Sequence, residues 1–359
     1  MNKKLIYKIH KWTGVTFGFI LFLLAISGVA ITFQHELMPK LYPTYFHVEA
    51  QGVHLPLETI ARKTQDYLGP EKSMTNLYAA EDLDEAHMIL YKDPTRSLPM
   101  LVTVNPYNGE VVGEMSLAKN VFAVMLFMHA NLFLGKTGKY LVGISGLILF
   151  LFVISGIYIW YPPNSLKQKI KRVFQFKVNI SQKLHHLMGL IFALPLAISA
   201  LTGFLIIFDF GYYLGRPLNG DAHRPEEMER MGVCEKEDQF KALSLLKPEE
   251  VKNLISIHFC TKKNSLMKAS FGLRDQNFLN GYKRLIIDPK TQSFVQEFDS
   301  DKDPKSWNYK RLTLFPIHTG EYLGNFGRVI VFITGIGLVI LYFSGLRLFF
   351  KRRKKLLPF

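Results

Sequence analysis

Four histidines occupy matched positions in two copies of one hydrophobic pattern. The segment that carries His10 near its start aligns without gaps on a later segment that carries His185 at the same place. Likewise, the apolar segment that follows His129 aligns on the one that follows His318, with glycines shared in register. A helix that only faces lipid needs neither histidine nor glycine at fixed places. The pattern therefore indicates an internal duplication whose histidines have a chemical role.

Paired imidazoles are suited to haem iron. Neutral imidazole is a common axial ligand of b-type haem, which needs no thioether bond to cysteine. If the duplicated helices pack about a pseudo-two-fold axis, His10 and His185 converge from opposite sides, and His129 and His318 form a second pair. We predict these four residues as axial ligands of two haems b per chain. A lone histidine at a span end more simply caps a helix, so the matched pairing is what favours ligation.

Two other histidines are alternative ligands. His186 follows His185 but points about 100° away on a helix, and Lys11 stands at its duplicate position. His35 lies at the right height for the second pair, with Phe210 at its duplicate position. The remaining histidines are expected on the surface or in the core of the loop domains: His47, His54, His87, His223 and His258.

Glycines recur at fixed spacing from the first histidine pair. One follows each histidine by a helical turn on the same face, and another lies five turns along, about 27 Å away in a straight helix. They are Gly14 and Gly28 after His10, and Gly189 and Gly203 after His185. The other two segments repeat the spacing with Gly138 and Gly156, and with Gly327 and Gly345. These glycines leave room for a flat macrocycle or let helices pack closely; the sequence leaves both open.

Four uncharged stretches must position these residues. Each reaches or approaches the ~20 apolar residues that cross a bilayer. They run over residues 12–35, 140–166, 184–208 and 329–346. The first is too long for a signal peptide, and its duplicate lies in mid-chain. We therefore predict an α-helical membrane protein with four transmembrane helices.

The net charge of +15 comes from three basic segments at span ends, which are the N-terminus, the middle loop and the C-terminal tail. Basic residues beside spans are typical of cytoplasmic loops and of attraction to lipid headgroups. This distribution argues against a nucleic-acid partner. It predicts a membrane protein with both termini and the middle loop in the cytoplasm and two large loops on the other side of the membrane.

The two large loops show strand and turn patterns. The first contains an expected helix at 57–68, strands at 88–91 and 100–104, and the turn Asn105-Pro-Tyr-Asn-Gly109 before a strand that starts at Val111. The second repeats a weaker version at 285–287 and 294–295. Its two cysteines, Cys234 and Cys260, form a disulfide in an oxidising compartment or remain two buried thiols.

The strand-turn-strand run VTVNPYNGEVVGE resembles the hallmark of the PepSY domain, a small helix-plus-sheet module. Spans of the form H-x-x-x-G…S/T-G and LH…LG-x-x-G extend the resemblance to the bacterial PepSY-associated transmembrane family over essentially the whole chain. Some members of that family resemble di-haem ferric-siderophore reductases of the inner membrane, and others have no established activity. The resemblance implies two periplasmic α+β PepSY-like domains.

The predicted layout follows the chain. It places the cytoplasmic N-terminus and first transmembrane helix at 1–35, the first periplasmic domain at 36–119, an interfacial helix and the second transmembrane helix at 120–163, a basic cytoplasmic loop at 164–183, the third transmembrane helix at 184–209, the second periplasmic domain at 210–317, the fourth transmembrane helix at 318–347 and a basic tail at 348–359.

The predicted function is transfer of electrons through two haems to a ferric siderophore or other Fe(III) chelate in the periplasm, with release of Fe(II). The chain has no dinucleotide, P-loop or flavin motif, so the expected donor is a cytoplasmic reductase or a membrane quinol. No catalytic residue is assigned, and Trp307 and Tyr309 are only candidates for contact with the chelate. The alternatives are a membrane-anchored PepSY sensor or protease-inhibitory module, which gives the histidines no role, and an iron or haem transporter.

Overall fold

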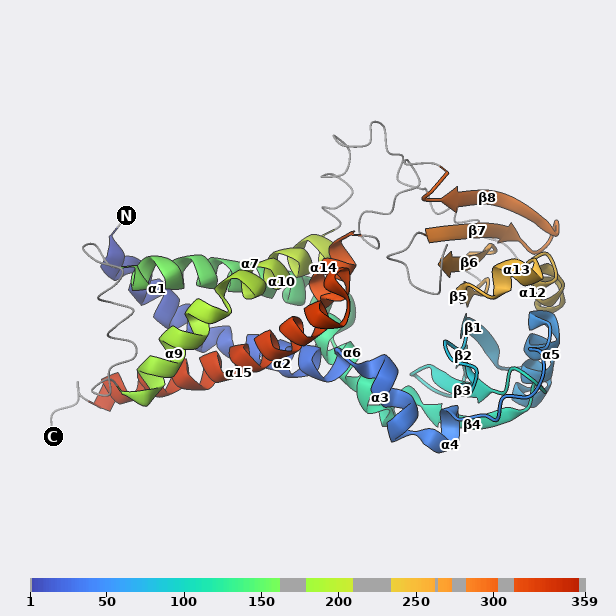
Figure 1. Cartoon of the computed structure of the whole chain (residues 1–359), viewed down its shortest axis with the longest axis horizontal. Helices are drawn as coiled ribbons and strands as arrows, with labels where there is room; N and C mark the ends of the chain where they lie inside the picture. Colours follow the sequence, from blue (N-terminus) through green and yellow to red (C-terminus); the bar gives the residue numbers. More distant parts are fainter. Residues whose placement is uncertain are drawn as a thin grey trace. The chain divides into compact units, whose positions relative to one another are not determined.

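The computed structural model describes residues 2–161, 179–208, 234–261, 264–272, 282–302 and 313–354. The chain folds into two compact units. One unit is helical and combines the described parts of 1–33, 125–211 and 313–359. The other contains a β-sheet and combines the described parts of 34–124 and 212–312. Figure 1 shows the helices and strands of each unit.

The helical unit repeats one arrangement twice. A bent pair of helices is followed by a short helix and then by a long one. The first set is α1 (Lys3–Thr16), α2 (Gly18–Ile31), α6 (Val121–Asn131) and α7 (Gly135–Trp160). The second set is α9 (Ile180–Ile191), α10 (Ala193–Ile207), α14 (Phe315–Thr319) and α15 (Gly324–Lys354), with the 3₁₀ turn η5 (Glu321–Leu323) between the last two.

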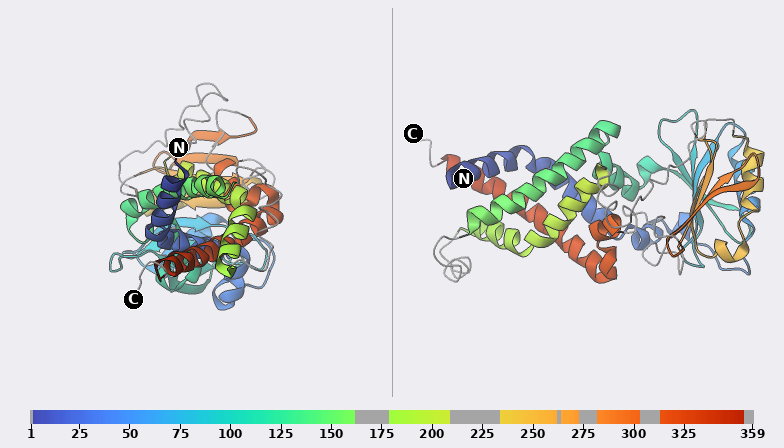
Figure 2. Two further views of the ribbon diagram at one scale, coloured as in Figure 1. Left: turned by 90° about the vertical axis from the view of Figure 1, so that its left-hand side faces the viewer. Right: turned by 90° about the horizontal axis from the view of Figure 1, so that it is seen from above.

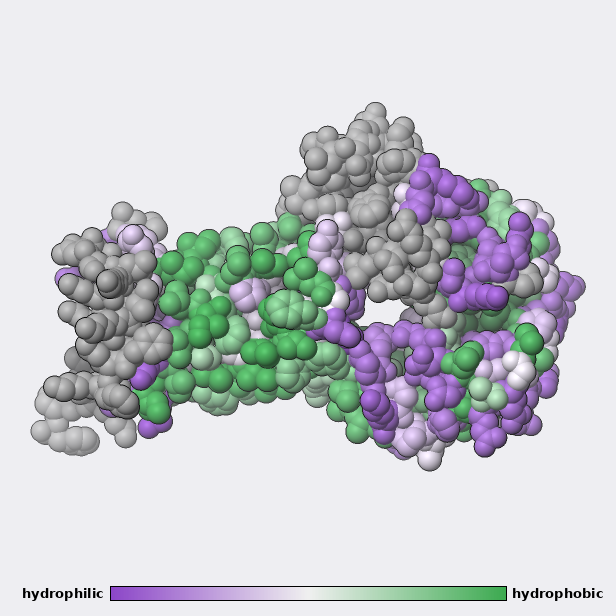
Figure 3. Space-filling view, viewed as in Figure 1, coloured by the Kyte–Doolittle hydropathy of each residue, from purple (hydrophilic) through white to green (hydrophobic). Residues whose placement is uncertain are grey.

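The helical unit has the length and hydropathy of a multi-pass membrane protein. Helix α7 and the segment 321–351 are each long and apolar enough to cross a bilayer. The pairs α1–α2 and α9–α10 reach that length only together, so the unit has two to four candidate spans. Hydrophobic side chains cover the visible surface of these helices (Figure 3). This agrees with the exposure of large apolar residues such as Leu151 and Ile154.

The first and third predicted spans are not straight. Helices α1 and α2 meet at an angle of 59°, and α9 and α10 meet at 64°. The prediction that Gly28 lies five turns along a straight helix from His10 is therefore wrong, because the helix bends at Phe17.

Each short helix ends in a tight turn before the long helix that follows. Leu132 and Phe133 before α7 and Gly135 at its first position have positive φ, as do Gly320 before α15 and Gly324 at its first position. A side chain at Gly138 or Gly327 would overlap the main chain of the preceding short segment. These two glycines therefore let the chain reverse closely, which explains their repetition.

The two long loops together form one antiparallel sheet of eight strands in the order β4-β3-β2-β1-β5-β6-β7-β8. The first loop supplies β1 (Ser73–Tyr78), β2 (His87–Lys92), β3 (Met100–Val104) and β4 (Val111–Ser116). The second supplies β5 (Leu254–His258), β6 (Met267–Gly272), β7 (Tyr282–Asp288) and β8 (Ser293–Asp299). The halves join where β1 pairs with β5. The loops thus merge into one sheet rather than standing as two separate domains.

Alternation of apolar residues along the strands gives the sheet two covered faces. Helices α5 (Leu57–Leu68), α12 (Lys236–Leu243) and α13 (Pro248–Val251) cover one face (Figure 2), where Ile60 and Phe240 pack on Ile89 and Ile257. On the other face of the first half, α3 (Gln34–Leu41) and α4 (Pro43–Phe46) carry residues that pack with Leu101. The turn η1 (Leu117–Lys119) follows β4.

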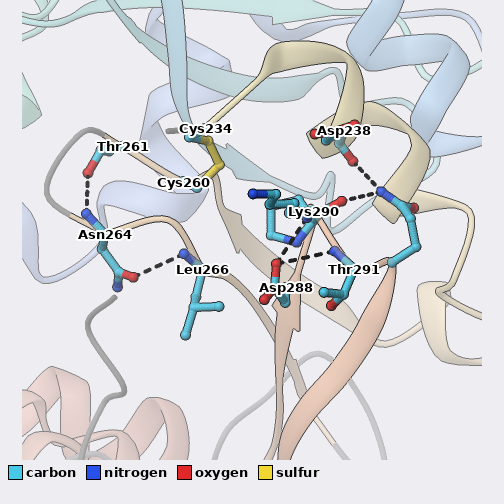
Figure 4. The surroundings of a disulfide bond; sticks show 11 residues. Cys234, Asp238, Cys260, Thr261, Asn264, Leu266, Asp288, Lys290 and Thr291 are labelled. Carbon is cyan, nitrogen blue, oxygen red and sulfur yellow. Dashed lines mark hydrogen bonds between the residues drawn. A yellow bond between two sulfur atoms is a disulfide. The ribbon is translucent and has the colours of Figure 1, made fainter. Parts of the chain in front are cut away.

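A disulfide joins Cys234 to Cys260, so the bridged alternative is confirmed (Figure 4). It ties the residues just before α12 to the end of β5. The helix at 57–68 and the strands expected in the first loop are also observed. Strands β1, β5 and β6 had no sequence prediction.

Candidate functional site: two pairs of histidines

The structure brings the four predicted histidines together as two pairs. The ring centroids of His10 on α1 and His185 on α9 lie 6.5 Å apart, with the rings at 86°. Those of His129 on α6 and His318 on α14 lie 6.2 Å apart, at 52°. We call these the inner pair and the outer pair. Each pair takes one residue from each copy of the duplication.

Both separations fit one metal ion between two imidazoles. A metal–imidazole bond is about 2 Å long, and the nitrogen lies about 1 Å from its own ring centre, so two opposed ligands have centroids about 6 Å apart. Among the described residues, no group of three or more His, Cys, Asp or Glu side chains is arranged so that it could hold a metal ion. Two protein ligands are too few for a closed zinc site but match haem, whose macrocycle supplies the remaining donors.

Each histidine lies against a five-residue stretch that ends in Ser-Gly or Thr-Gly. We call this stretch the cradle motif. It occurs at residues 24–28 (LAISG), 152–156 (FVISG), 199–203 (SALTG) and 341–345 (LYFSG). His129 lies on the first, His10 on the second, His318 on the third and His185 on the fourth. Each span therefore supports a histidine that comes from another helix.

Main-chain carbonyls orient three of the histidines. The first residue of the cradle motif accepts a hydrogen bond from Nδ1 of the ring. The bonds are His129 to Leu24 O at 2.9 Å, His185 to Leu341 O at 3.1 Å and His318 to Ser199 O at 2.9 Å. A carbonyl can only accept, so Nδ1 carries the proton and Nε2 remains free to bind a metal in the neutral ring.

The fourth residue of each cradle motif places a hydroxyl beside the same Nδ1. The distances are 3.2 Å for Ser27 and His129, 2.8 Å for Ser155 and His10, 3.1 Å for Thr202 and His318, and 3.2 Å for Ser344 and His185. Every one of these hydroxyls donates its own proton to a carbonyl of its helix. At His129, His185 and His318, whose Nδ1 also donates to a carbonyl, the hydroxyl oxygen is therefore the acceptor toward the imidazole.

The glycine that ends each cradle motif lets the ring approach the helix. A Cβ atom would lie 3.1 Å from His129 Cε1 at Gly28, 3.0 Å from His318 Cε1 at Gly203, 3.1 Å from His185 Cε1 at Gly345 and 3.5 Å from His10 Cε1 at Gly156. Gly28 and Gly203 therefore support the outer pair, not the inner histidines from which their spacing was counted.

Sequence reasoning missed the four hydroxyl residues. It also did not identify which histidine Gly156 or Gly345 supports. The available signal was the presence of Ser-Gly or Thr-Gly in each of the four segments, although α7 contains three such pairs and α15 contains two. That signal does not say which histidine each motif supports, because the partners lie about 100 residues or more apart in the chain.

A cavity of about 490 Å³ adjoins the inner pair. This volume lies within the ~300–1,000 Å³ typical of pockets for small ligands and cofactors. Gly14 and Gly189 line it, and a Cβ at Gly14 would meet no atom within 4 Å. A Cβ at Gly189 would make an ordinary contact with Leu341 at 3.7 Å. That these two glycines give room to a macrocycle, rather than let helices pack closely, stays a prediction. Lys11 is the one formally charged side chain among the lining residues.

The two pairs lie well apart along the helices. On α15, Gly345 packs against His185 of the inner pair. Ten residues earlier, Gly335 packs against Val29, which follows the glycine that supports His129 of the outer pair. On α7, Gly156 likewise packs against His10, and Gly146, ten residues earlier, packs against α10. Ten residues of helix span about 15 Å, which approximates the axial separation of the pairs.

The alternative ligands lie elsewhere or beside the site. His35 belongs to the sheet unit, is exposed, and has Nδ1 3.8 Å from a carboxylate oxygen of Glu81. His186 lines the inner cavity together with the inner pair. His47, His54, His87 and His258 all lie in the sheet unit, in agreement with their expected placement. His223, Phe210, Trp307 and Tyr309 lie outside the described residues.

The chain was compared with known proteins. The family described as the PepSY-associated TM region matches residues 7–352, which is nearly the whole chain. No curated protein matches it.

Proposed function

The chain belongs to the PepSY-associated TM region family, and from its histidine pairs we propose that it is an inner-membrane electron-transfer protein with two b-type haems. Its activity is reduction of an Fe(III) chelate, such as a ferric siderophore, in the periplasm. Bound haem supplies one-electron redox chemistry at each pair. The observation that carries this proposal is that both pairs have the ring separation of opposed axial ligands and rest on the same cradle motif.

The residues of the cradle motif prepare each imidazole for ligation. Their oxygens hold the proton on Nδ1, which selects the tautomer that binds iron through Nε2. Their glycines fix the distance between ring and helix. The lining of the inner cavity is mostly apolar and includes Leu21, Phe152 and Leu338, which lowers the polarity around the inner pair. The chain thus supplies orientation and electrostatics rather than covalent catalysis.

The direction of transfer follows from charge. The helix ends near the inner pair carry Lys3, Lys4, Lys8 and Lys11 on α1 and Lys351 on α15. Lysines at span ends favour the cytoplasmic side, which makes the inner pair the entry for electrons from a cytoplasmic reductase or quinol. One electron converts Fe(III) to Fe(II), which siderophore oxygens hold far less firmly, so iron is released on the other side.

A visible spectrum of the purified protein tests the proposal. We expect a Soret band, α and β bands that sharpen with dithionite, and about two haems b per chain by pyridine haemochrome assay. A folded but colourless preparation that takes up no added haem would contradict the proposal. It would favour the sensor or protease-inhibitory alternative.

Single substitutions separate the two pairs. His10→Ala or His185→Ala should remove the inner haem and leave the outer one. His129→Ala or His318→Ala should remove the outer haem and leave the inner one. The matched control is His47→Ala, because His47 is exposed and lies near Asp84 in the sheet unit. It should retain both haems. Loss of haem from this control, or two haems in the His185→Ala variant, would contradict the assignment of ligands.

A further inference from the structure

His10 is held differently from the other three histidines. Within the described part of the chain, its Nδ1 has one hydrogen-bond partner, Ser155 Oγ at 2.8 Å. The other three rings each have a carbonyl and a hydroxyl within 3.2 Å. The corresponding carbonyl of its cradle motif, Phe152 O, accepts a hydrogen bond from the Ser155 hydroxyl at 3.1 Å, as the first carbonyl of each other motif does from its own hydroxyl. Unlike those three carbonyls, it does not also accept from the imidazole.

The position of the ring explains this difference. A Cβ at Gly156 would lie 3.5 Å from His10 Cε1, whereas the other three motifs give 3.0–3.1 Å. The Phe152 ring packs beside the imidazole, with a centroid distance of 5.3 Å. The His10 ring therefore stands farther from its supporting helix. Ser155 bridges the wider gap, because its hydroxyl lies within hydrogen-bond distance of both His10 Nδ1 and the Phe152 carbonyl.

We propose that Ser155 is the positioning residue that sets the tautomer and basicity of His10. The proposal rests on the proposed function of His10 as a haem ligand. At the other three histidines, loss of the hydroxyl leaves the carbonyl bond in place. At His10, loss of the hydroxyl leaves Nδ1–H without its acceptor, so the tautomer protonated on Nε2, which cannot bind iron, is no longer disfavoured.

Two consequences follow for the inner haem. Its affinity falls, because part of the population carries the proton on the ligating nitrogen. Its midpoint potential rises, because an imidazole without this hydrogen bond is a weaker donor and stabilises Fe(III) less. Second-sphere substitutions of this kind typically reduce metal-site affinity about 10–100-fold.

The experiment compares Ser155→Ala with Ser344→Ala in the full-length protein. Ser344 is the matched control, because its hydroxyl serves His185 of the same pair but the Leu341 carbonyl remains. Both substitutions are made in the His129→Ala background, which leaves the inner haem alone in the spectrum. Haem dissociation to apomyoglobin and a potentiometric titration are measured. The Ser155→Ala protein in the otherwise native chain provides a folding check, because it should keep its outer haem.

We expect Ser155→Ala to lose inner haem at least tenfold faster and to have a raised midpoint potential. Ser344→Ala should change both values by less than Ser155→Ala does, because the Leu341 carbonyl still accepts from His185. Ser155→Thr, which retains a hydroxyl, should restore the parental values. Unchanged affinity and potential in Ser155→Ala would overturn this inference alone. So would equal changes in Ser344→Ala. A native chain that binds no haem would instead overturn the proposed function, and this inference with it.

Discussion

The glycine that ends each cradle motif controls how closely an imidazole approaches its supporting helix. The inner pair uses two such glycines with different clearances. An added Cβ would lie 3.1 Å from His185 at Gly345 and 3.5 Å from His10 at Gly156. The first distance is too short for an unstrained contact, and the second is an ordinary van der Waals contact. Two chemically equal substitutions should therefore differ in effect.

We predict that Gly345→Ala reduces occupancy of the inner haem several-fold, because His185 must shift to accept the methyl group. Gly156→Ala should leave occupancy near the native value. Both changes favour helix by a similar amount, about 1 kcal/mol, so helix propensity cancels in the comparison. Haem content per chain after purification measures the effect. The reverse order of the two variants would contradict the geometry of the cradle motifs.

A buried histidine makes the stability of the sheet unit depend on pH. His87 is almost fully buried, and its Nδ1 accepts a hydrogen bond from the Ala80 N–H at 2.9 Å. Burial, with a smaller contribution from nearby His54, lowers the pKa of His87 from 6.5 to about 4. Between pH 4 and pH 6.5, the unfolded chain thus binds more protons at this residue than the folded chain does. Stability is fully present above pH 6.5 and is lost as the pH falls toward 4.

We predict that the sheet unit loses roughly 3 kcal/mol of stability from this group between pH 7 and pH 4. In His87→Gln the free energy of unfolding should depend less steeply on pH between pH 7 and pH 4, although the variant is less stable at pH 7. Urea unfolding followed by hydrogen exchange in β2 measures both. His47→Gln, at an exposed position, should retain the native slope. A native slope in His87→Gln would show that other groups carry the effect.

At the scale of elements, the two bent helix pairs have local causes. Gly18 begins α2 directly after the bend at Phe17, and Pro195 lies in the first turn of α10 after the bend at Phe192. Proline is tolerated there because the first amides of a helix have no partner within the helix. The bends put the histidine-bearing helices α1 and α9 at an angle to the apolar helices α2 and α10. His10 and His185 can thus meet across the bundle.

The disulfide holds helix α12 near the sheet. Cys234 and Cys260 are separated by 26 residues, and closing a loop of this size stabilises a fold by about 3 kcal/mol in the chain-entropy account. Arg62 of α5 also holds α12, with two hydrogen bonds of 2.6 and 2.7 Å to the carboxylate of Glu237.

We predict that Cys234→Ser combined with Cys260→Ser lowers the free energy of unfolding of the sheet unit by about 3 kcal/mol. Pulse proteolysis in urea measures the change. Dithiothreitol should destabilise the native protein by a similar amount and leave the double variant unaffected. Haem content should not change, because both cysteines lie in the sheet unit and the histidine pairs lie in the helical unit. Equal stability of native and variant proteins would show that the bridge adds nothing.

At the scale of the whole molecule, the duplication places two similar sites at different depths of one membrane unit. The pairs lie about 15 Å apart along α7 and α15, which is about half of the ~30 Å hydrocarbon layer. Electron transfer weakens steeply with distance, so two sites in series can serve both surfaces where one could not. In the proposed function, the outer pair is therefore required for reduction on the far side.

We predict that proteoliposomes loaded with a reductant reduce an external Fe(III) siderophore when they contain the native protein. His318→Ala should lower the rate at least tenfold while the inner haem is still reduced. His47→Ala serves as the control and should keep the native rate. The appearance of a ferrous-chelator complex outside the vesicles gives the rate. A native rate in His318→Ala would exclude a path through the outer pair.

Much of this protein is encoded locally. The apolar stretches, the register of His10 with His185 and of His129 with His318, and the turn at 105–109 follow from short-range composition and spacing. Three features become visible only in the folded chain: which cradle motif supports which histidine, where the spans bend, and that both loops share one sheet. These features depend on contacts between residues far apart in the chain, such as Ser27 with His129 and β1 with β5. Hydrophobic periodicity says which face of a segment is buried, but not which partner covers it.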